Sequence, residues 1–129
     1  MKSSQGFSLV ELIIATTIMV VLSVVAMVSY SGTNRRARDS RRAADLQKLS
    51  MSLEMIRQVG NTYPTSLGSL VSGGYMESLP VDPKNYTYYY IRNSNYEYYL
   101  EAQMEDLGST SGSFGNNCGG ICNYRITNP

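Results

Sequence analysis

Residues 7–30 read FSLVELIIATTIMVVLSVVAMVSY, an almost wholly apolar or small run of 24 residues with one charge, Glu11. As an α-helix, such a run extends over roughly 36 Å, which exceeds the ~30 Å hydrocarbon core of a bilayer. A secretory signal peptide would be shorter, and no small-residue cleavage site clearly closes this run. A buried helix of a soluble domain would need apolar partners on all sides, and the rest of the chain offers none of comparable extent. The run therefore predicts a membrane-inserted helix.

The composition of the whole chain argues against an enzyme. Its 129 residues include 11 Lys+Arg and 10 Asp+Glu, for a formal net charge of +1, and this balance does not indicate nucleic-acid binding. The absence of His excludes Ser–His, Cys–His and zinc–His catalysis. No nucleophile has a base partner and no two acids form a recognisable acid/base pair, so we expect no catalytic residues.

A short motif leads into the apolar run. A polar leader with one basic residue ends in a glycine, and an aromatic residue and an acid follow at fixed spacing: Lys2, Gly6, Phe7, Ser8, Leu9 and Glu11. Here the sequence resembles the type IV pilin and type II secretion pseudopilin family. That family's pattern is a basic leader ending in Gly, then Phe-(Ser/Thr)-Leu-x-Glu opening a long hydrophobic helix. The resemblance is close over residues 1–30 and looser as far as Pro83.

The resemblance implies a processing reaction and an assembly contact. A membrane-embedded prepilin peptidase would cleave between Gly6 and Phe7, and the new Phe7 amine would be N-methylated. Glu11 of one subunit would pair with the Phe7 amine of its neighbour in a filament. From the residues alone, Glu11 is also consistent with a carboxylate that stays hydrated at the interface. A negative charge is favourable at a helix N-terminus within one subunit as well.

The helix is predicted to continue beyond the apolar run. Apolar residues recur at three- and four-residue spacing, which is typical of an amphipathic helix: Ala43, Leu46, Leu49, Leu53 and Ile56. Gly60-Asn61 supplies a stop signal. We therefore expect one helix over residues 7–59, whose amphipathic part, residues 31–59, packs on a small body.

Five arginines follow the apolar run, and three interpretations stay open for them: Arg35, Arg36, Arg38, Arg41 and Arg42. They form a solvated helix face near lipid headgroups, make subunit contacts in a fibre, or capture DNA as in competence-related pili. The near-neutral chain and the embedded Asp39 disfavour the third. The positive-inside rule would place this cluster in the cytoplasm. We give precedence to the leader motif, because a dedicated peptidase sets the topology in the resembling family.

The body, residues 60–129, is predicted to be a small antiparallel sheet. Strands at 86–92 and 96–104 form a hairpin around a turn at 93–95, and a last strand covers 123–127. Nine of the eleven tyrosines lie beyond residue 70, and we expect them to pack on the helix with their hydroxyls in water. A stacking surface for a ligand is the alternative. The fold class is α+β and pilin-like, with one long N-terminal helix packed on this sheet.

The two cysteines lie in a Gly/Ser/Asn-rich loop. Cys118 and Cys122 enclose three residues, which is not the C-x-x-C redox spacing, and two Cys without His make a poor zinc site. In an extracytoplasmic body we expect a disulfide between them, with two reduced thiols as the alternative. The type II major pseudopilins usually carry a calcium site of clustered Asp residues here. The nearby acids are Glu105 and Asp106 only, so we expect no metal and no cofactor.

These observations predict a filament subunit with a cleaved leader, residues 1–6, and a transmembrane and assembly helix, residues 7–30. It would be a single-pass inner-membrane protein with an extracytoplasmic body, and copies of the apolar helix would bury one another in an extracytoplasmic filament. Expected partners are further filament subunits, the prepilin peptidase, an inner-membrane assembly platform and membrane lipid, but not nucleic acid. A type II secretion pseudopilus is the first interpretation. The alternatives are a type IV pilus subunit for adhesion, motility or DNA uptake, and an unprocessed membrane-anchored binding module.

Overall fold

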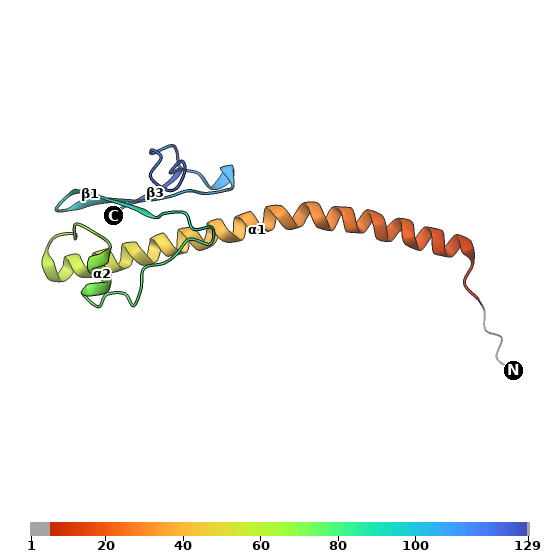
Figure 1. The fold of residues 1–129 in the computed structure, drawn as a ribbon, viewed down its shortest axis with the longest axis horizontal. Coiled ribbons are helices and arrows are strands. Elements are labelled where there is room, and N and C mark those ends of the chain that lie inside the picture. The colour runs from red at the N-terminus through yellow and green to blue at the C-terminus, as the bar shows by residue number, and fades with distance from the viewer. Residues whose placement is uncertain (1–5, 129) are drawn as a thin grey trace. The chain divides into compact units, whose positions relative to one another are not determined.

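The structure, a computed structural model, describes residues 6–128. The predicted leader lies outside the described residues, except for Gly6. The chain divides into two units, Met1–Asn34 and Arg35–Pro129. In chain order the elements are α1 (Leu9–Gly60), α2 (Gly68–Ser72), β1 (Tyr89–Ser94), β2 (Glu97–Ala102), the 3₁₀ turn η1 (Leu107–Ser109) and β3 (Tyr124–Thr127) (Figure 1).

The first unit consists of the apolar part of α1 and the residues before it. Helix α1 is long and apolar enough to cross a membrane, and its most apolar window is 0% buried. Large side chains such as Phe7, with 85% of its surface exposed, and Ile14, with 54%, contact no core. Apolar surface of this extent is stable only in lipid or against other apolar helices.

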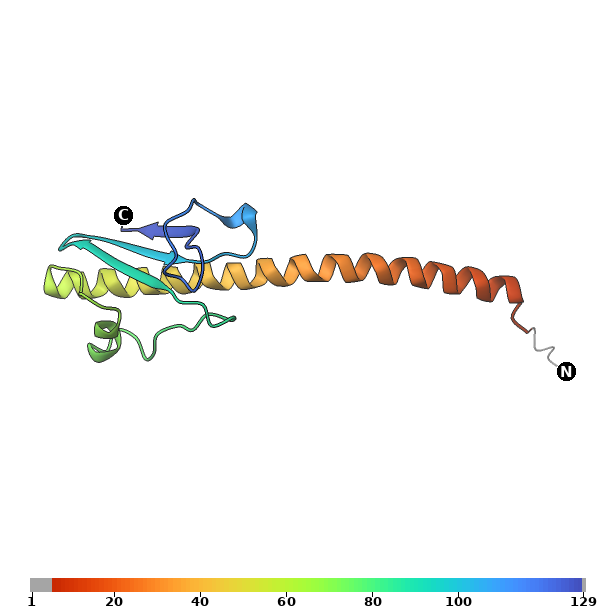
Figure 2. The ribbon, with the colours of Figure 1, turned by 45° about the horizontal axis from the view of Figure 1, so that its top comes forward.

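In the second unit, the three-stranded antiparallel sheet, in the order β1-β2-β3, lies along the C-terminal part of α1 (Figures 1 and 2). Helix α1 contributes the fully buried Leu46, Leu49 and Leu53, which lie on one helix face. Strand β2 contributes Tyr98 and Leu100 from its inner face. The predicted α+β class, with one long helix packed on an antiparallel sheet, is confirmed.

The hairpin turn differs from the prediction. The chain turns at residues 95–96 and not at 93–95, because an irregularity between Arg92 and Ser94 shifts the register and extends β1. Strand β1 also begins later than predicted, since the Thr87 N–H donates to the Cys118 carbonyl, 3.1 Å away, and not to β2. At the end of α1, Asn61 adopts the left-handed conformation, with φ of 58°.

Several tyrosine hydroxyls bind protein groups, and the expectation that the hydroxyls of the nine tyrosines beyond residue 70 reach water is wrong for three of them, Tyr88, Tyr90 and Tyr98. Tyr63 donates to Glu54 and Tyr88 donates to Asp45, at 2.7 and 2.9 Å. The Tyr98 hydroxyl lies 2.8 Å from Ser50 Oγ. The Tyr90 hydroxyl donates to the Pro64 carbonyl at 2.7 Å. These hydrogen bonds fix the sheet and its flanking loop on α1.

Candidate functional site

The predicted cleavage site lies immediately before helix α1. Gly6, Phe7 and Ser8 are exposed and have no regular secondary structure. A Cβ atom added to Gly6 would meet no atom within 4 Å, so the fold of the described residues does not itself require glycine there. The peptide bond between Gly6 and Phe7 is therefore accessible in an irregular segment.

Glu11 and Ser8 cap the start of α1 reciprocally. The Ser8 N–H donates to Glu11 Oε2 at 3.1 Å, and the Val10 N–H donates to Ser8 Oγ at 3.4 Å. A Ser three residues before a Glu, bonded in this way, is a capping box, which satisfies backbone donors that have no partner within the helix. The sequence indicated a favourable charge at this helix end, but it did not identify Ser8 as the partner. Pairing of Glu11 with the Phe7 amine of another subunit stays a prediction.

Arg42 is the centre of a buried ion cluster. Its side chain is 0% exposed, and its Nε donates to Asp82 Oδ2 at 2.5 Å. Its Nη1 donates to Asp39 Oδ1 at 2.7 Å and to Glu105 Oε1 at 2.9 Å. A buried guanidinium is tolerated only with such partners. Arg42 thus joins α1 to the loop before β1 and to the segment after β2.

Glu105 receives two further cations. Arg38 binds it in a bidentate manner, with N–O distances of 2.7 and 2.6 Å, and Lys84 Nζ lies 2.9 Å away. The Asp39 carboxylate accepts the backbone N–H groups of Glu105 and Asp106, the latter at 2.7 Å. The segment after β2 is therefore attached to α1 by both its side chains and its backbone.

The cluster shifts the pKa values of its members in favour of the charged forms. Burial alone would lower the pKa of Arg42, but its hydrogen bonds to carboxylates raise it above the ordinary value. Hydrogen bonds, first of all from Arg38, hold the pKa of Glu105 far below its usual range. Burial would raise the pKa of Asp82, but the Arg42 hydrogen bond and two backbone N–H groups lower it.

The five arginines of the cluster seen in the sequence thus divide into two groups. The interpretation of a solvated face is wrong for Arg42, which is buried, and for Arg38, which is half-buried and ion-paired. The solvent exposure that it implies is confirmed for Arg35 and Arg41, and for Arg36, whose side chain is 78% exposed although it lies 3.1 Å from Asp106. Their position near lipid headgroups stays a prediction.

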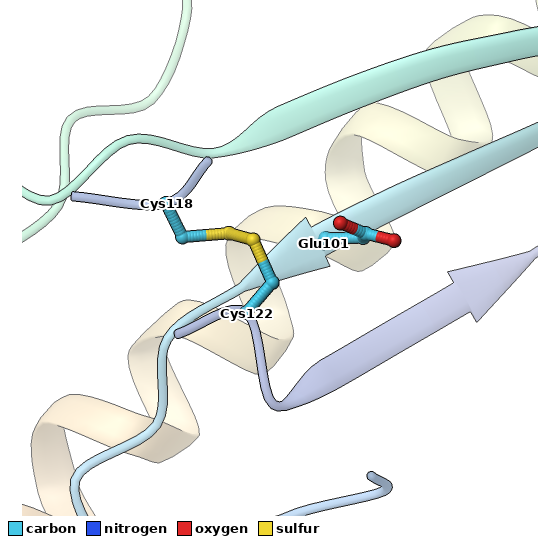
Figure 3. A group of neighbouring side chains, drawn as sticks. All are labelled: Glu101, Cys118 and Cys122. Atoms are coloured by element: carbon cyan, nitrogen blue, oxygen red, sulfur yellow. A yellow bond between two sulfur atoms is a disulfide. The ribbon is translucent and has the colours of Figure 1, made fainter. Parts of the chain in front are cut away.

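Cys118 and Cys122 form a disulfide, with their Cα atoms 5.3 Å apart, next to the buried Glu101 (Figure 3). The two sulfur atoms bond to each other, so they offer no thiolate to a metal ion. Glu101 Oε1 accepts from Arg125 Nε at 2.9 Å. Between the cysteines, Gly120 passes so close to Gln103 that an added Cβ would meet Gln103 Oε1 at 2.3 Å.

Comparison with known proteins supports the processing motif at the start of the chain and the resemblance of most of the chain to pilins. The family model for the prokaryotic N-terminal methylation motif matches residues 1–27. The chain is 26% identical over 106 residues to the type II secretion system core protein G of Vibrio cholerae, covering 70% of this chain and 73% of that protein. It is 28% identical over 102 residues to the type IV wide pilus major component of Thermus thermophilus, covering 79% and 75%. The chain is similar to type IV pilins and type II secretion pseudopilins.

A further relative of this pilin-like chain is core protein G of Klebsiella pneumoniae, 29% identical over 99 residues that cover 64% of this chain and 71% of that protein. No solved structure matches the chain significantly. The relatives are named as a secretion-system core protein and a pilus component, in agreement with the prediction that this chain is not an enzyme.

The C-terminal segment of this chain does not fit the calcium ion that the resemblance to type II major pseudopilins implies. Residues 107–129 contain no Asp or Glu. The two acids just before them already bind cations, since Glu105 binds Arg38, Arg42 and Lys84, and Asp106 binds Arg36. A calcium site needs six to eight free oxygen ligands. Ion pairs and the disulfide hold this segment.

We expect Arg42→Leu to lower the free energy of unfolding by about 3–5 kcal/mol, because it leaves the buried Asp39 and Asp82 without a cation. The matched control is Arg41→Leu, which removes the same charge from an exposed site and is expected to change stability by less than about 0.5 kcal/mol. Thermal unfolding of the full chain in detergent, followed by near-ultraviolet circular dichroism, measures both. Equal stability of the two variants would contradict the role of Arg42.

We expect the thermal midpoint to stay nearly constant from pH 7 to about pH 5 and to fall below about pH 4. The pKa values of Glu105 and Asp82 are lowered in the folded state, so their contribution is present above the unfolded pKa and is lost as the pH falls toward the folded values. Glu105→Gln should make this acid loss shallower. Glu77→Gln, at an exposed position, should leave the pH profile unchanged.

Proposed function

We propose that this chain is a structural subunit of an extracytoplasmic filament, the pseudopilus of a type II secretion system. The single observation that carries the proposal is the apolar part of α1, whose described large side chains are exposed and would need lipid before assembly and other copies of the chain afterwards. The motif at residues 1–27 and the similarity to core protein G support it. In this proposal the chain is anchored in the inner membrane and meets the prepilin peptidase and an assembly platform there.

A type IV pilus is the second candidate, because the relative from Thermus thermophilus is named a major component of such a pilus and aligns with 79% of this chain. Deletion of the gene in its host distinguishes the two functions. Loss of secreted proteins from the medium, with surface fibres intact, supports the pseudopilus. Loss of surface fibres with normal secretion supports the pilus. We also propose that the Cys118–Cys122 disulfide forms after export.

Processing is expected to remove residues 1–6, so that the mature protein begins at Phe7 with a methylated amine. Gly6→Val should block cleavage, because the peptidase must accommodate the backbone at the cut and the fold itself leaves that position open. Gly32→Val is the matched control, since a Cβ there also meets no atom within 4 Å. Intact-mass analysis of protein from the native host measures the result. If the wild-type protein retains residues 1–6, this prediction is contradicted.

Filament yield is expected to depend on the charge of Glu11 and not on its role in the capping box. Glu11→Gln keeps the Ser-x-x-Gln form of the box but removes the negative charge that the Phe7 amine of a neighbour would meet. We expect it to reduce the yield of sheared filaments by about tenfold or more. A tenfold change corresponds to a loss of about 1.4 kcal/mol in the free energy of subunit association. Glu11→Ala should be as severe, and Glu11→Asp intermediate, because its shorter side chain reaches less far.

Ser8→Ala is the matched control for Glu11, because it removes the Ser8 hydroxyl from the cap and keeps the charge. It should assemble nearly normally once its processing has been verified by mass. All variants are compared at equal levels in the membrane. Normal filaments from Glu11→Gln, with few from Ser8→Ala, would show that capping is what assembly needs, and the intersubunit pair would have to be abandoned.

A further inference from the structure

The ion cluster leaves three arginines exposed near the apolar helix. The carboxylates of Asp39, Asp82 and Glu105 form ion pairs with Arg38 and Arg42. The side chains of Arg35, Arg36 and Arg41 are exposed to solvent. Among the described residues 6–128, no carboxylate lies within ion-pair distance of Arg35 or Arg41. Arg35 and Arg41 therefore make no ion pair within the described part of the chain, although the charge of Arg35 acts on Asp106.

The helix surface around these arginines presents no exposed acid. The acids of residues 31–48 are Asp39 and Asp45, which are 3% and 5% exposed. Asp39 binds Arg42 and two backbone N–H groups, and Asp45 accepts from the Tyr88 hydroxyl. The exposed surface of this stretch is cationic, and it would attract a layer of negative charge.

The three arginines point in different directions around α1. At about 100° per residue, Arg36 and Arg41 are rotated by about 100° and 240° from Arg35. A contact with one neighbouring protein would place basic residues on a single face. Side chains spread around the axis fit a partner that surrounds the helix, and a sheet of lipid headgroups does so.

The short stretch of chain after the apolar run keeps these arginines close to the membrane surface. Arg35 follows Tyr30, the last residue of the apolar run, by five residues. In a helix these five residues span about 7.5 Å, which is within the Debye length of about 8 Å at physiological salt. Arg41 follows Tyr30 by eleven residues, or about 16.5 Å of helix, so its long side chain has farther to reach. Tyr30 itself is 71% exposed and is a residue type enriched at membrane interfaces.

We propose that Arg35, Arg36 and Arg41 form a collar that binds the phosphate groups of anionic phospholipids in the leaflet next to the body. The proposal rests on the membrane anchor of the proposed function. It assigns the exposed arginines to the unassembled subunit, which anionic lipids would hold at a fixed depth in the bilayer. Subunit contacts are the competing assignment, and the experiment separates the two.

The experiment uses the full chain in vesicles of phosphatidylcholine with trace spin-labelled phosphatidylglycerol or phosphatidylcholine. Electron paramagnetic resonance then gives the relative affinity of the protein for the two lipids. We expect the wild type to prefer phosphatidylglycerol, and Arg35→Gln/Arg41→Gln to reduce this preference by about threefold or more, because basic groups near an anionic surface contribute strongly to binding. The preference should also weaken in 1 M salt.

Lys48→Gln/Arg92→Gln is the matched control, because it removes the same charge from positions farther along the chain, and it should keep the wild-type preference. Vesicle flotation tests the anchor separately. A chain that does not float overturns the anchor and this proposal together. A floating chain whose lipid preference is unchanged in Arg35→Gln/Arg41→Gln, or is lost equally in the control, overturns the collar alone. Unchanged lipid preference with loss of filaments assigns these arginines to subunit contacts.

Discussion

The buried guanidinium group of Arg42 holds two loops of the body against α1. Arg42 is 0% exposed, and an uncompensated charge at such a site would cost several kcal/mol. Asp39 comes from α1 itself, but Asp82 and Glu105 come from segments 40 and 63 residues farther along the chain. Neither segment is a strand or a helix. The charge of Arg42 therefore positions two irregular segments that backbone pairing does not hold.

The two parts of α1 obtain their stability from different surroundings. In the second unit, Leu46, Leu49 and Leu53 are covered by the sheet and by tyrosines whose hydroxyls bond to α1. In the first unit, the described apolar side chains meet no core. The helix start is capped by Ser8 and Glu11, and the hydroxyls of Thr16, Thr17 and Ser23 bond back to carbonyls of α1 itself. A single copy in water leaves that apolar surface uncovered, so the functional form of the first unit includes lipid or other copies.

The sequence predicts the elements better than it predicts the contacts between them. The spacing of Leu46, Leu49 and Leu53 indicates the packed helix face, because burial requires periodicity. The hairpin turn is predicted at the wrong residues, because the irregularity after Arg92 has no sequence signal of its own. Only the pair of Arg42 with Asp39 is visible at helical spacing. The pairs with Asp82 and Glu105 depend on tertiary folding, so five neighbouring arginines look alike although three of them are ion-paired and one, Arg42, is buried.

This division of the arginines also bears on the conflict between the leader motif and the positive-inside rule. That rule counts Lys and Arg residues within about 15–20 residues of the ends of a membrane helix. In the folded body, Arg38 and Arg42 are held by Glu105 and by buried carboxylates, so their return through a membrane would first require these ion pairs to break. In the proposed topology, these ion pairs would oppose the return of the two arginines through the membrane once the body has folded. The pairs that position the loops would then also help to keep the body on one side of the membrane.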